Sequence, residues 1–466
     1  MPVRARGMTI EGADGRRYLD CLSGAGALAL GHNHPVVLEA IRRVLDSGVP
    51  LQAFDLATPV QDAFVTELFR SLPAGLAGHA RVQFCGPGET DAVEAAFRLV
   101  RAATGRTGVL TFSAAHHGVT AEAAALPGET NDVQVAQLSY PRDHRRPVGV
   151  GDPQGSELAS PLIEFALEDP EPGGPRPAGV ILEPVQGENG VIPAPDAWMR
   201  RMREITTARS IPLIVDEVQT GVGRTGAFWA VQHSGVTPDV MVLSRAIGGS
   251  LPLAVLVYRD DLDAGQSGAP AGTFRGNQLA MAAGTATLTY VRENQLAARA
   301  ATLGARMLDQ LRALRPEFPC VGDVRGRGLM IGIEFMECAE AEGGEDLAVR
   351  TDDAAHDGLG PAAPAPSADP PHLPAPRIAA AVQRESLRRG LIVELGGPHA
   401  SVVRLLPPLT ISDEQATAVL DRLADAVQTV ARAHAGGPTG PRRSHEAGSG
   451  PRHQKDRTKR AVRRGS

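Results

Sequence analysis

Short apolar runs alternate with helical stretches through the first half of the chain. The runs are rich in valine, isoleucine and leucine, which is typical of strands buried on both faces of a sheet. They lie at 82–84, 109–112, 179–184, 212–218, 240–244 and 253–258, and helices such as 91–103 and 196–208 separate some of them. This order predicts an α/β fold, with a mostly parallel sheet covered by helices on both faces. Ligands are expected at the C-terminal ends of its strands.

The pattern before this region predicts a hairpin and a helix. The segment MTIEGADGRRYLDCLSG holds the turn signal Asp14-Gly15 between two strand-like runs. A helix is expected from about 35 to 45, with an apolar stripe at Val36, Leu38, Ile41 and Leu45.

A second unit is expected at roughly 305–436, after a long helix that starts beyond Asn277. Its predicted strands are 328–335, 391–395 and 402–406, and Ser412 with Gln415 form a capping box before the last helix. The predicted division is therefore 1–50 as an N-terminal segment of the small domain, 51–304 as the large domain and 305–436 as the C-terminal small domain.

Two segments are too polar or too rich in proline to pack. Residues 357–376 carry repeated proline and alanine and are interpreted as an exposed loop. The basic tail 437–466 has few apolar residues and is expected to be disordered. Such a tail can touch anionic surfaces, but a solvated extension is the favoured interpretation.

Charge and composition exclude several classes of protein. The net charge of −6 argues against a nucleic-acid surface. No apolar run approaches the ~20 residues that span a bilayer, and the first residues lack the apolar core of a signal peptide. Four widely spaced cysteines without a C-x-x-C pair suggest neither disulfides nor a metal site. We therefore expect a cytoplasmic protein without metal or membrane contacts.

The first candidate site is FCGPGETDAVEAAF, a strand, a glycine turn and a helix that is expected to start near Thr90 or Asp91. Unpaired backbone N–H groups at such a helix start can bind a phosphate. A simple turn is the alternative interpretation. The signal is weak on its own.

Three charged residues stand on or just after other predicted strands. Asp216, in PLIVDEVQTGVGRTG, can pair with a protonated ring nitrogen, although a structural ion pair is the alternative. Glu188 lies in ILEPVQGENG, and Arg404, in VVRLLPPLT, can clamp a carboxylate through two hydrogen bonds. A surface salt bridge is the alternative for these two.

Seven segments in this order resemble the class III aminotransferases, which use pyridoxal 5'-phosphate. They are FCGPGETDAVEAAF, AAHHGVT, EPVQGENGV, VDEVQTGVGRTGAFWA, LSRAIGGSLPLAV, GTFRGNQLA and RLLPPLTIS. The resemblance runs from about Gly7 to His434, apart from the proline-rich loop. It implies an aspartate-aminotransferase-like fold (PLP fold type I) and, most closely, amino transfer between glutamate or 2-oxoglutarate and 2,4-diaminobutyrate.

The resemblance also assigns roles to individual residues. Gly88, Glu89 and Thr90 match the cofactor phosphate loop, and His116 matches an aromatic ring stacked on the pyridine. Asp216 matches the carboxylate that keeps the pyridinium nitrogen protonated, Val218 the residue on the opposite ring face, and Gln219 the contact to the phenolic oxygen. Thr273 matches a phosphate contact from a neighbouring subunit, which implies a homodimer. Arg404 matches the arginine that holds the substrate α-carboxylate, and Glu188 the switch carboxylate that pairs with it.

The chain departs from the family at the central position. Arg245 stands where the family has the lysine that forms the Schiff base. A guanidinium has a pKa above ~12 and delocalised lone pairs, so it is a poor nucleophile and a poor proton shuttle. Lysine occurs only at Lys455 and Lys459. These two lie in the predicted tail.

Three smaller departures accompany Arg245. Glu89 replaces a small residue, and a carboxylate there opposes a phosphate unless it points away. His116 replaces the usual aromatic residue, and segment 1–50 looks shorter at its start than in the family. Two hypotheses follow: a transaminase, or a catalytically degenerate paralogue that binds the cofactor noncovalently or serves as a dimer partner.

Overall fold

A seven-stranded sheet organises the larger part of this computed structural model, which describes residues 1–54, 56–115, 117, 135–141, 176–263, 273–337 and 373–435. Its strand order is β4-β12-β11-β10-β7-β5-β6. The strands are β4 (Ala80–Phe84), β5 (Val109–Phe112), β6 (Val135–Leu138), β7 (Gly179–Leu182), β10 (Leu213–Asp216), β11 (Val240–Leu243) and β12 (Val255–Arg259). Only β12 runs antiparallel to its neighbours among these described strands. The predicted mostly parallel sheet is confirmed.

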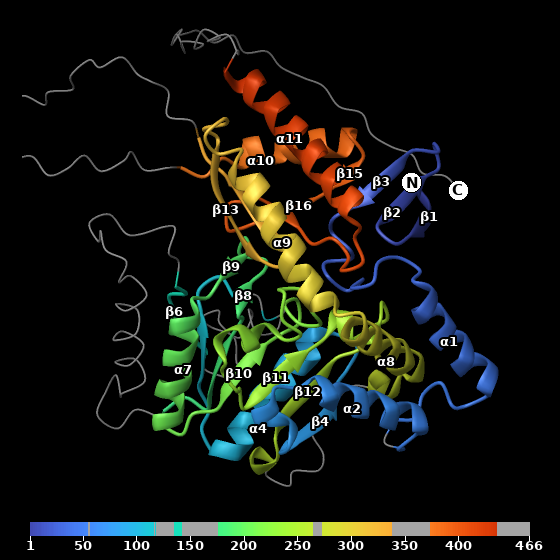
Figure 1. Ribbon diagram of the computed structural model, residues 1–466. Coiled ribbons are helices and arrows are strands. Elements are labelled where there is room, and N and C mark those ends of the chain that lie inside the picture. The colour runs from blue at the N-terminus through green and yellow to red at the C-terminus, as the bar shows by residue number, and fades with distance from the viewer. Residues whose placement is uncertain are drawn as a thin grey trace, which may run out of the picture.

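Alternate side chains of each strand enter two different cores. Ile214, Val240 and Leu256 pack with α4 (Glu89–Thr104), whereas Leu213, Val215 and Met241 pack with the helices of the other face. Those helices are α2 (Pro59–Ser71), α7 (Asp196–Ala208) and α8 (Gln278–Glu293). Burial on both faces explains why these strands read as continuous apolar runs. Figure 1 shows the helices around the sheet.

Helix α8 also supports the turn that follows β11. Gly284 of α8 lies against η2 (Arg245–Gly248), a 3-10 turn, and a Cβ at Gly284 would stand 2.0 Å from the carbonyl oxygen of Ile247. Only glycine permits this approach. The packing fixes the backbone that carries Arg245.

The N-terminal strands join a late segment of the chain in a second sheet. Its order is β1-β2-β3-β15, with β1 (Pro2–Arg6), β2 (Thr9–Gly12), β3 (Arg17–Asp20) and β15 (Leu391–Ile392). Strands β2 and β3 form the hairpin predicted around Asp14-Gly15. Strand β3 pairs in parallel with β15, which brings the first residues beside the C-terminal part.

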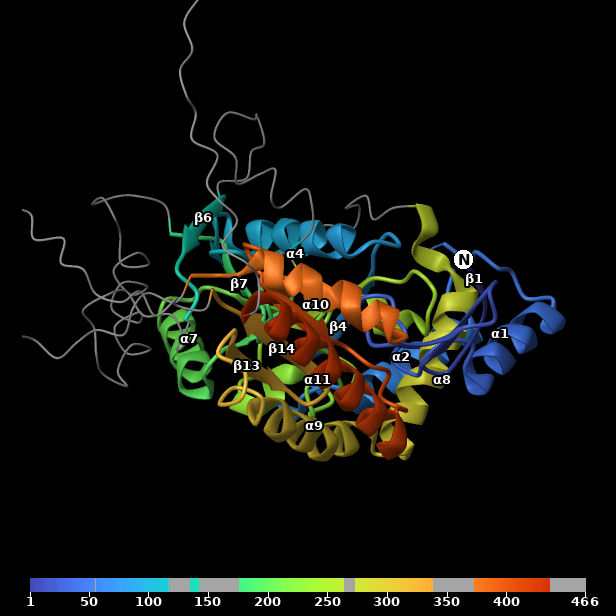
Figure 2. The ribbon, with the colours of Figure 1, turned by 90° about the horizontal axis from the view of Figure 1, so that it is seen from above.

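The C-terminal part is built on a sheet of order β13-β14-β17-β16, above the large sheet in Figure 1. Its strands are β13 (Val321–Arg327), β14 (Met330–Phe335), β16 (Glu394–Gly396) and β17 (Val402–Leu405), and its helices are α9 (Leu296–Arg312), α10 (Pro376–Arg388) and α11 (Asp413–Ala435). Figure 2 shows α10 and α11 side by side across this sheet. Ser412 and Gln415 form the predicted capping box at the start of α11.

Two predicted elements are divided in the structure. The run at 391–395 forms β15 and β16 in different sheets, because the chain passes from one sheet to the other at Val393. The long helix beyond Asn277 is α8 followed by α9, and Gln295 between them has a φ of 52°. That left-handed residue ends the first helix and redirects the chain.

The remaining elements are short, apart from α1. They are α1 (Pro35–Ser47), α3 (Ala74–Ala77), β8 (Val185–Gln186), β9 (Ile192–Pro193), η1 (Ala230–Ser234), η3 (Asp260–Leu262) and η4 (Thr273–Gly276). No helix among the described residues is long and apolar enough to cross a membrane. Residues 357–372 of the predicted exposed loop 357–376 lie outside the described residues, and the predicted tail 437–466 lies wholly outside them. The end of the predicted loop is corrected, because Ala375 is buried and Pro376 begins α10.

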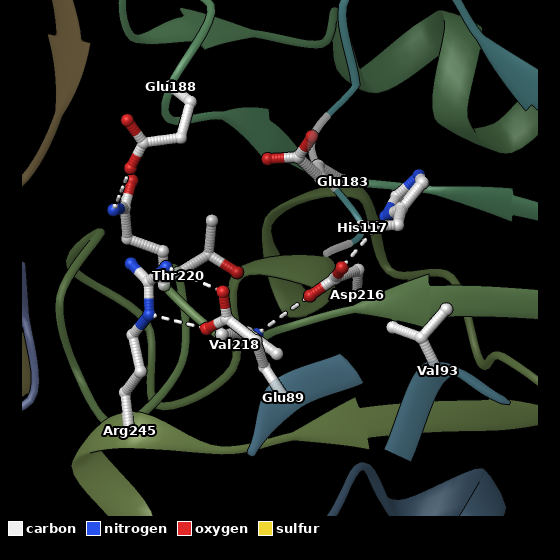
Figure 3. Close-up of a pocket in the computed structure, with 10 residues that line it drawn as sticks. Glu89, Val93, His117, Glu183, Glu188, Asp216, Val218, Thr220 and Arg245 are labelled. Atoms are coloured by element: carbon white, nitrogen blue, oxygen red, sulfur yellow. Dashed lines mark hydrogen bonds and ion pairs between the residues drawn. The ribbon is translucent and has the colours of Figure 1, made fainter. Parts of the chain in front are cut away.

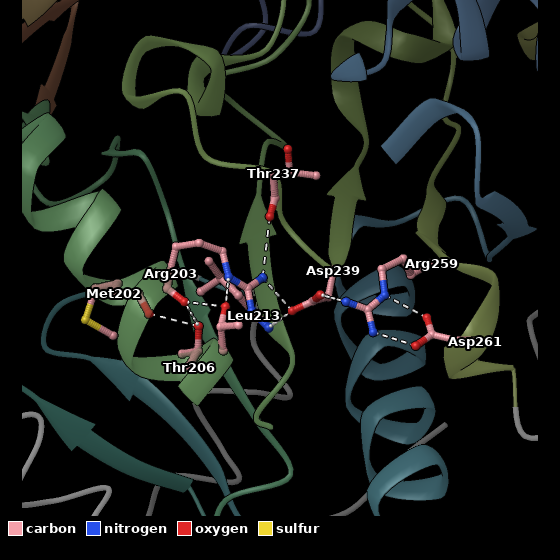
Figure 4. Close-up of polar contacts among 9 residues, drawn as sticks. Met202, Arg203, Thr206, Leu213, Thr237, Asp239, Arg259 and Asp261 are labelled. Carbon is pink, nitrogen blue, oxygen red and sulfur yellow. Dashed lines mark hydrogen bonds and ion pairs between the residues drawn. The ribbon is translucent and has the colours of Figure 1, made fainter. Parts of the chain in front are cut away.

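A charge network secures the sheet at the end opposite the β11 C-terminus (Figure 4). Asp239, just before β11, accepts hydrogen bonds from Arg203 of α7 at 2.6 Å and from Arg259 of β12 at 2.7 Å. Arg259 also binds Asp261 through two nitrogens, at 2.7 and 2.5 Å. Arginine thus serves as a structural residue here, far along the strands from Arg245.

Candidate active site

Arg245 begins the turn at the C-terminal end of β11, where the sheet topology predicts a ligand site. Its φ of 52° lies in the left-handed region, which residues other than glycine rarely adopt. The preceding Ser244 donates its hydroxyl to the carbonyl oxygen of Leu253 at 3.0 Å. The turn is therefore held from both sides, and it directs the Arg245 side chain into the cavity shown in Figure 3.

The guanidinium of Arg245 is paired with the carboxylate of Glu89 in a two-pronged ion pair. Nε donates to Oε2 at 2.7 Å, and Nη2 donates to Oε1 at 3.0 Å. The third nitrogen, Nη1, donates to the carbonyl oxygen of Ala25 at 3.0 Å. The side chains of Arg245 and Glu89 are 18% and 25% exposed. Parallel hydrogen bonds of this kind hold both side chains in one geometry.

The surroundings keep Arg245 charged. Burial alone would lower the pKa of Arg245. The hydrogen bonds from Arg245 to Glu89, together with the negative charges of Glu89, Glu188 and Asp216, outweigh burial and raise that pKa above its ordinary value. A neutral, nucleophilic guanidine is thus even less accessible at this position than in water.

Helix α4 begins at Glu89, slightly earlier than the predicted start near Thr90 or Asp91. Gly88 is the N-cap, and its backbone N–H donates to Oδ2 of Asp91 at 3.0 Å. Glu89 and Asp91 place two carboxylates in the first turn. These charges already complement the positive end of the helix dipole, which disfavours a further anion there.

Asp216 ends β10 and is 5% exposed. Its Oδ2 lies 2.8 Å from Nδ1 of His117, and its Oδ1 accepts the backbone N–H of Val218 at 3.0 Å. The predicted ring-stacking residue His116 lies outside the described residues. Its neighbour His117 was not singled out from the sequence, although the His-His doublet is a visible signal.

Arg404 of β17 lies against the loop that carries Glu188. Its Nη2 donates to Oε2 of Glu188 at 2.8 Å and to Oε2 of Glu394 at 2.6 Å. Gln219 donates through Nε2 to Oε1 of Glu188 at 3.2 Å. Burial acts to raise the pKa of Glu188, but the charge and hydrogen bond of Arg404 overcome it and lower that pKa.

Glu394 is a second carboxylate that sequence reasoning missed. It is the direct cross-strand partner of Arg404 between β16 and β17. A glutamate inside an otherwise apolar strand was the available signal. Arg404 is 1% exposed, and its Nε and Nη1 have no hydrogen-bond partner within the part of the chain that the structure describes. Gly396 leaves room for this guanidinium, since a Cβ there would stand 2.7 Å from Nε.

Thr273 begins η4 and is exposed on the single chain. It is not among the residues that line the cavity. Next to it lies an exposed apolar patch that we define as Leu51, Phe54, Leu56 and Phe274, with side chains between 47% and 71% exposed. The two segments are joined by the hydrogen bond from Ala53 N to Gly276 O and by Arg275, 4.0 Å above the Phe54 ring.

The cavity at the strand ends is small and acidic (Figure 3). Glu89, Glu183, Glu188 and Asp216 line it together with Arg245, Val93, His117, Val218, Gln219 and Thr220. Its volume is about 20 Å³, room for roughly one water. The site residues predicted on α4, β10 and the loop after β11 are thus brought together, and Glu188 links them to Arg404. No cluster of potential metal ligands occurs among the described residues.

Solved structures share this fold over almost the whole chain. An amine transaminase from an uncultivated Pseudomonas species, in its PLP-bound form, is 27% identical and superposes with a TM-score of 0.76 over 92% of this chain and 95% of the other. A phospholyase from Arthrobacter in complex with phosphoethanolamine is 26% identical, with a TM-score of 0.77 over 92% and 94%. The fold therefore hosts more than one chemistry.

Curated relatives are more similar in sequence. A diaminobutyrate--2-oxoglutarate aminotransferase of Rhizobium meliloti is 49% identical over 92% of this chain and 88% of its own length. One from Haemophilus influenzae is 40% identical over 91% and 89%. The family model for class III aminotransferases matches residues 1–427. The chain therefore belongs to the class III aminotransferase family, as its seven sequence segments indicated.

Proposed function

We propose that this chain descends from diaminobutyrate--2-oxoglutarate aminotransferases but does not transfer amino groups in the way that its relatives are named for. The descent is supported by the identity of 49% to the Rhizobium meliloti protein. The loss of transfer is supported by one observation, the ion pair of Arg245 with Glu89 in the cavity. The substrates of the lineage are an amino acid and a 2-oxo acid, with pyridoxal phosphate as cofactor.

Part of the site fits pyridoxal phosphate. Asp216 is buried at the end of β10 and oriented by His117, so it is suited to a protonated ring nitrogen. Val218 faces the same cavity and offers an apolar contact to a ring. Gln219 Oε1 is buried with no partner among the described residues.

The other part of the site does not fit. Attachment requires a neutral amine at the end of β11, and the chain has no lysine before residue 455. The start of α4, which would receive the phosphate, carries the Glu89 and Asp91 carboxylates. The cavity that Arg245 and Glu89 line together with eight other residues has a volume of about 20 Å³. The site as built therefore does not hold the cofactor covalently.

Recognition of substrate carboxylates is the function that the remaining residues support. Arg404 donates hydrogen bonds to two carboxylates, and its Nε and Nη1 have no partner among the described residues. A substrate carboxylate would take the place of Glu188, whose side chain is 35% exposed. We therefore propose a non-catalytic family member that binds dicarboxylates such as glutamate or 2-oxoglutarate.

We further propose a cytoplasmic homodimer. The apolar patch beside Thr273 is suited to contact with a second copy, since exposed apolar clusters of this kind mark interaction sites. Cys21 and Cys85 are buried free thiols, which fits a reducing compartment.

The direct test is amino transfer by the unaltered protein. Purified protein, 2,4-diaminobutyrate, 2-oxoglutarate and pyridoxal phosphate are combined, and glutamate formation is measured beside the Rhizobium meliloti relative. Loss of both the nucleophile and the proton shuttle predicts a rate at least ~10³-fold lower than that of the relative. A rate within about tenfold of the relative would overturn the proposal.

A further inference from the structure

The two departures from the family at positions 89 and 245 are one structural unit, although 156 residues separate them in sequence. Arg245 gives two of its three nitrogens to Glu89, and both carboxylate oxygens of Glu89 are used. No other carboxylate stands within hydrogen-bond distance of Arg245 in the described part of the chain. The neighbouring Glu188 is bound instead to Arg404 and Gln219. Glu89 is therefore the dedicated counter-charge of Arg245.

This pairing gives Glu89 a role beyond that of a tolerated substitution. Its carboxylate lies at the first residue of α4, where the backbone N–H groups of a helix would otherwise face an external anion. The chain thus supplies its own anion to the helix start and to the cation beside it. Both residues, rather than the arginine alone, occupy the space at the strand ends (Figure 3).

We infer that Glu89 is a tethered anion that closes the cofactor position together with Arg245, so that returning a lysine to position 245 does not by itself reopen the site. This inference rests on the proposed loss of covalent cofactor binding and deepens it.

Two physical effects of Glu89 would persist in an Arg245→Lys variant. A carboxylate next to the new ammonium favours its charged form, whereas the lysine must be neutral to condense with the cofactor aldehyde and release water. The same carboxylate also repels the phosphate of an approaching cofactor. Removing Glu89 cancels both effects. A reopened site therefore requires both changes.

The experiment compares four proteins in a Lys455→Arg and Lys459→Arg background, which removes the two natural lysines. They are the parent, Arg245→Lys, Arg245→Lys with Glu89→Ala, and Arg259→Lys with Asp261→Ala. The protein with Arg259→Lys and Asp261→Ala is the matched control. Arg259 and Asp261 form the same two-pronged contact outside the cavity, so this variant tests whether any new lysine beside a lost carboxylate suffices.

Each protein is incubated with pyridoxal phosphate, reduced with borohydride and digested, and the modified peptide is identified by mass spectrometry. Noncovalent affinity is measured by equilibrium dialysis, and thermal melting establishes that each variant is folded. We expect attachment at position 245 in the double variant alone, with affinity at least tenfold higher than in Arg245→Lys.

Two results would overturn the inference. Equal attachment in Arg245→Lys and in the double variant would show that Glu89 does not close the site, while the proposed function would stand. No attachment in either folded variant would show that another feature closes it. Amino transfer by the parent would instead overturn the proposed function itself.

Discussion

Glu188 and Arg404 join the loop between β8 and β9 to the C-terminal sheet, with Oε2 of Glu188 2.8 Å from Nη2 of Arg404. Glu188 lies in the loop between β8 and β9, and Arg404 lies in the middle of the C-terminal sheet. Glu394 holds the same nitrogen at 2.6 Å. The arginine thus pairs with one carboxylate from its own sheet and with one from the loop, and these side chains are 33% and 35% exposed.

This relationship predicts that Glu188→Gln strengthens binding of 2-oxoglutarate. The ligand carboxylate then competes with a neutral amide, and we expect about a tenfold gain in affinity, or about 1.4 kcal/mol. Isothermal titration calorimetry measures it directly. Arg404→Lys is the matched control and should lower the affinity for 2-oxoglutarate, because lysine cannot bind a carboxylate through two parallel hydrogen bonds. Unchanged affinity in Glu188→Gln would mean that Glu188 does not compete for Arg404.

Glu217 predicts a pH dependence of stability. Burial raises the pKa of Glu217 to about 7 from 4.5, while hydrogen bonds from Thr220 and the backbone N–H of Val231 act in the opposite direction. Because the folded pKa is raised, its contribution to stability is fully present below pH 4.5 and is lost as pH rises through about 7.

The size of this effect is roughly 3 kcal/mol, since one pKa unit corresponds to ~1.4 kcal/mol. Glu217→Gln keeps the buried oxygen and removes the charge, so we expect its melting temperature to exceed that of the parent at pH 8 more than at pH 6. Denaturant titrations at the two pH values check the sign. An equal difference at both pH values would contradict a titrating Glu217.

Arg224 predicts a large loss of stability on truncation. It is 3% exposed and donates to the carbonyl oxygens of Leu329 and Pro407, which join the loop after β10 to the C-terminal part. Burial lowers the pKa of Arg224 to about 10, so it stays charged at neutral pH. Arg224→Met leaves both carbonyls without this donor, and we expect a loss of ~2–4 kcal/mol in urea denaturation. A loss below about 0.5 kcal/mol would be at variance with these contacts.

The apolar patch predicts the state of assembly. Phe274 is 61% exposed and Phe54 is 50% exposed, and both lie on the surface beside Thr273. Replacing Phe274 with Asp should shift the protein from dimer to monomer in light scattering, because a charge buried in an apolar contact is costly. Val3→Asp is the control, because Val3 is similarly exposed, at 57%, on the N-terminal sheet. A dimer that persists in both variants would place the interface elsewhere.

Much of the fold follows from local patterns. The strand at 109–112 and the helix at 196–208 have the predicted bounds, because buried β-branched runs and amphipathic periodicity are local signals. The division of 391–395 between two sheets was missed, since it depends on which strands lie nearby. Glu394 was missed for the same reason.

The sequence predicted which residues lie near the site, but it did not predict which of their side chains pair with one another. Asp216 and Glu188 line the cavity, whereas Arg404 lies inside β17 and is linked to the cavity through Glu188. In the sequence, Arg245 and Glu89 are two separate departures from the family pattern. The Glu89 carboxylate was expected to repel a phosphate unless it pointed away. The pairing of Arg245 with Glu89 depends on side-chain directions from a helix start and a turn far apart in sequence, which no local pattern encodes.

The most direct measurement is peptide-mapped mass spectrometry of the unaltered protein after incubation with pyridoxal phosphate and reduction with borohydride. We predict adducts only at the N-terminal amine, Lys455 or Lys459, at levels that 2-oxoglutarate does not change, and no detectable glutamate-dependent turnover. A stoichiometric adduct at one of these amines that disappears on incubation with glutamate before reduction, together with turnover, would contradict the account, because another amine would then be replacing the missing lysine.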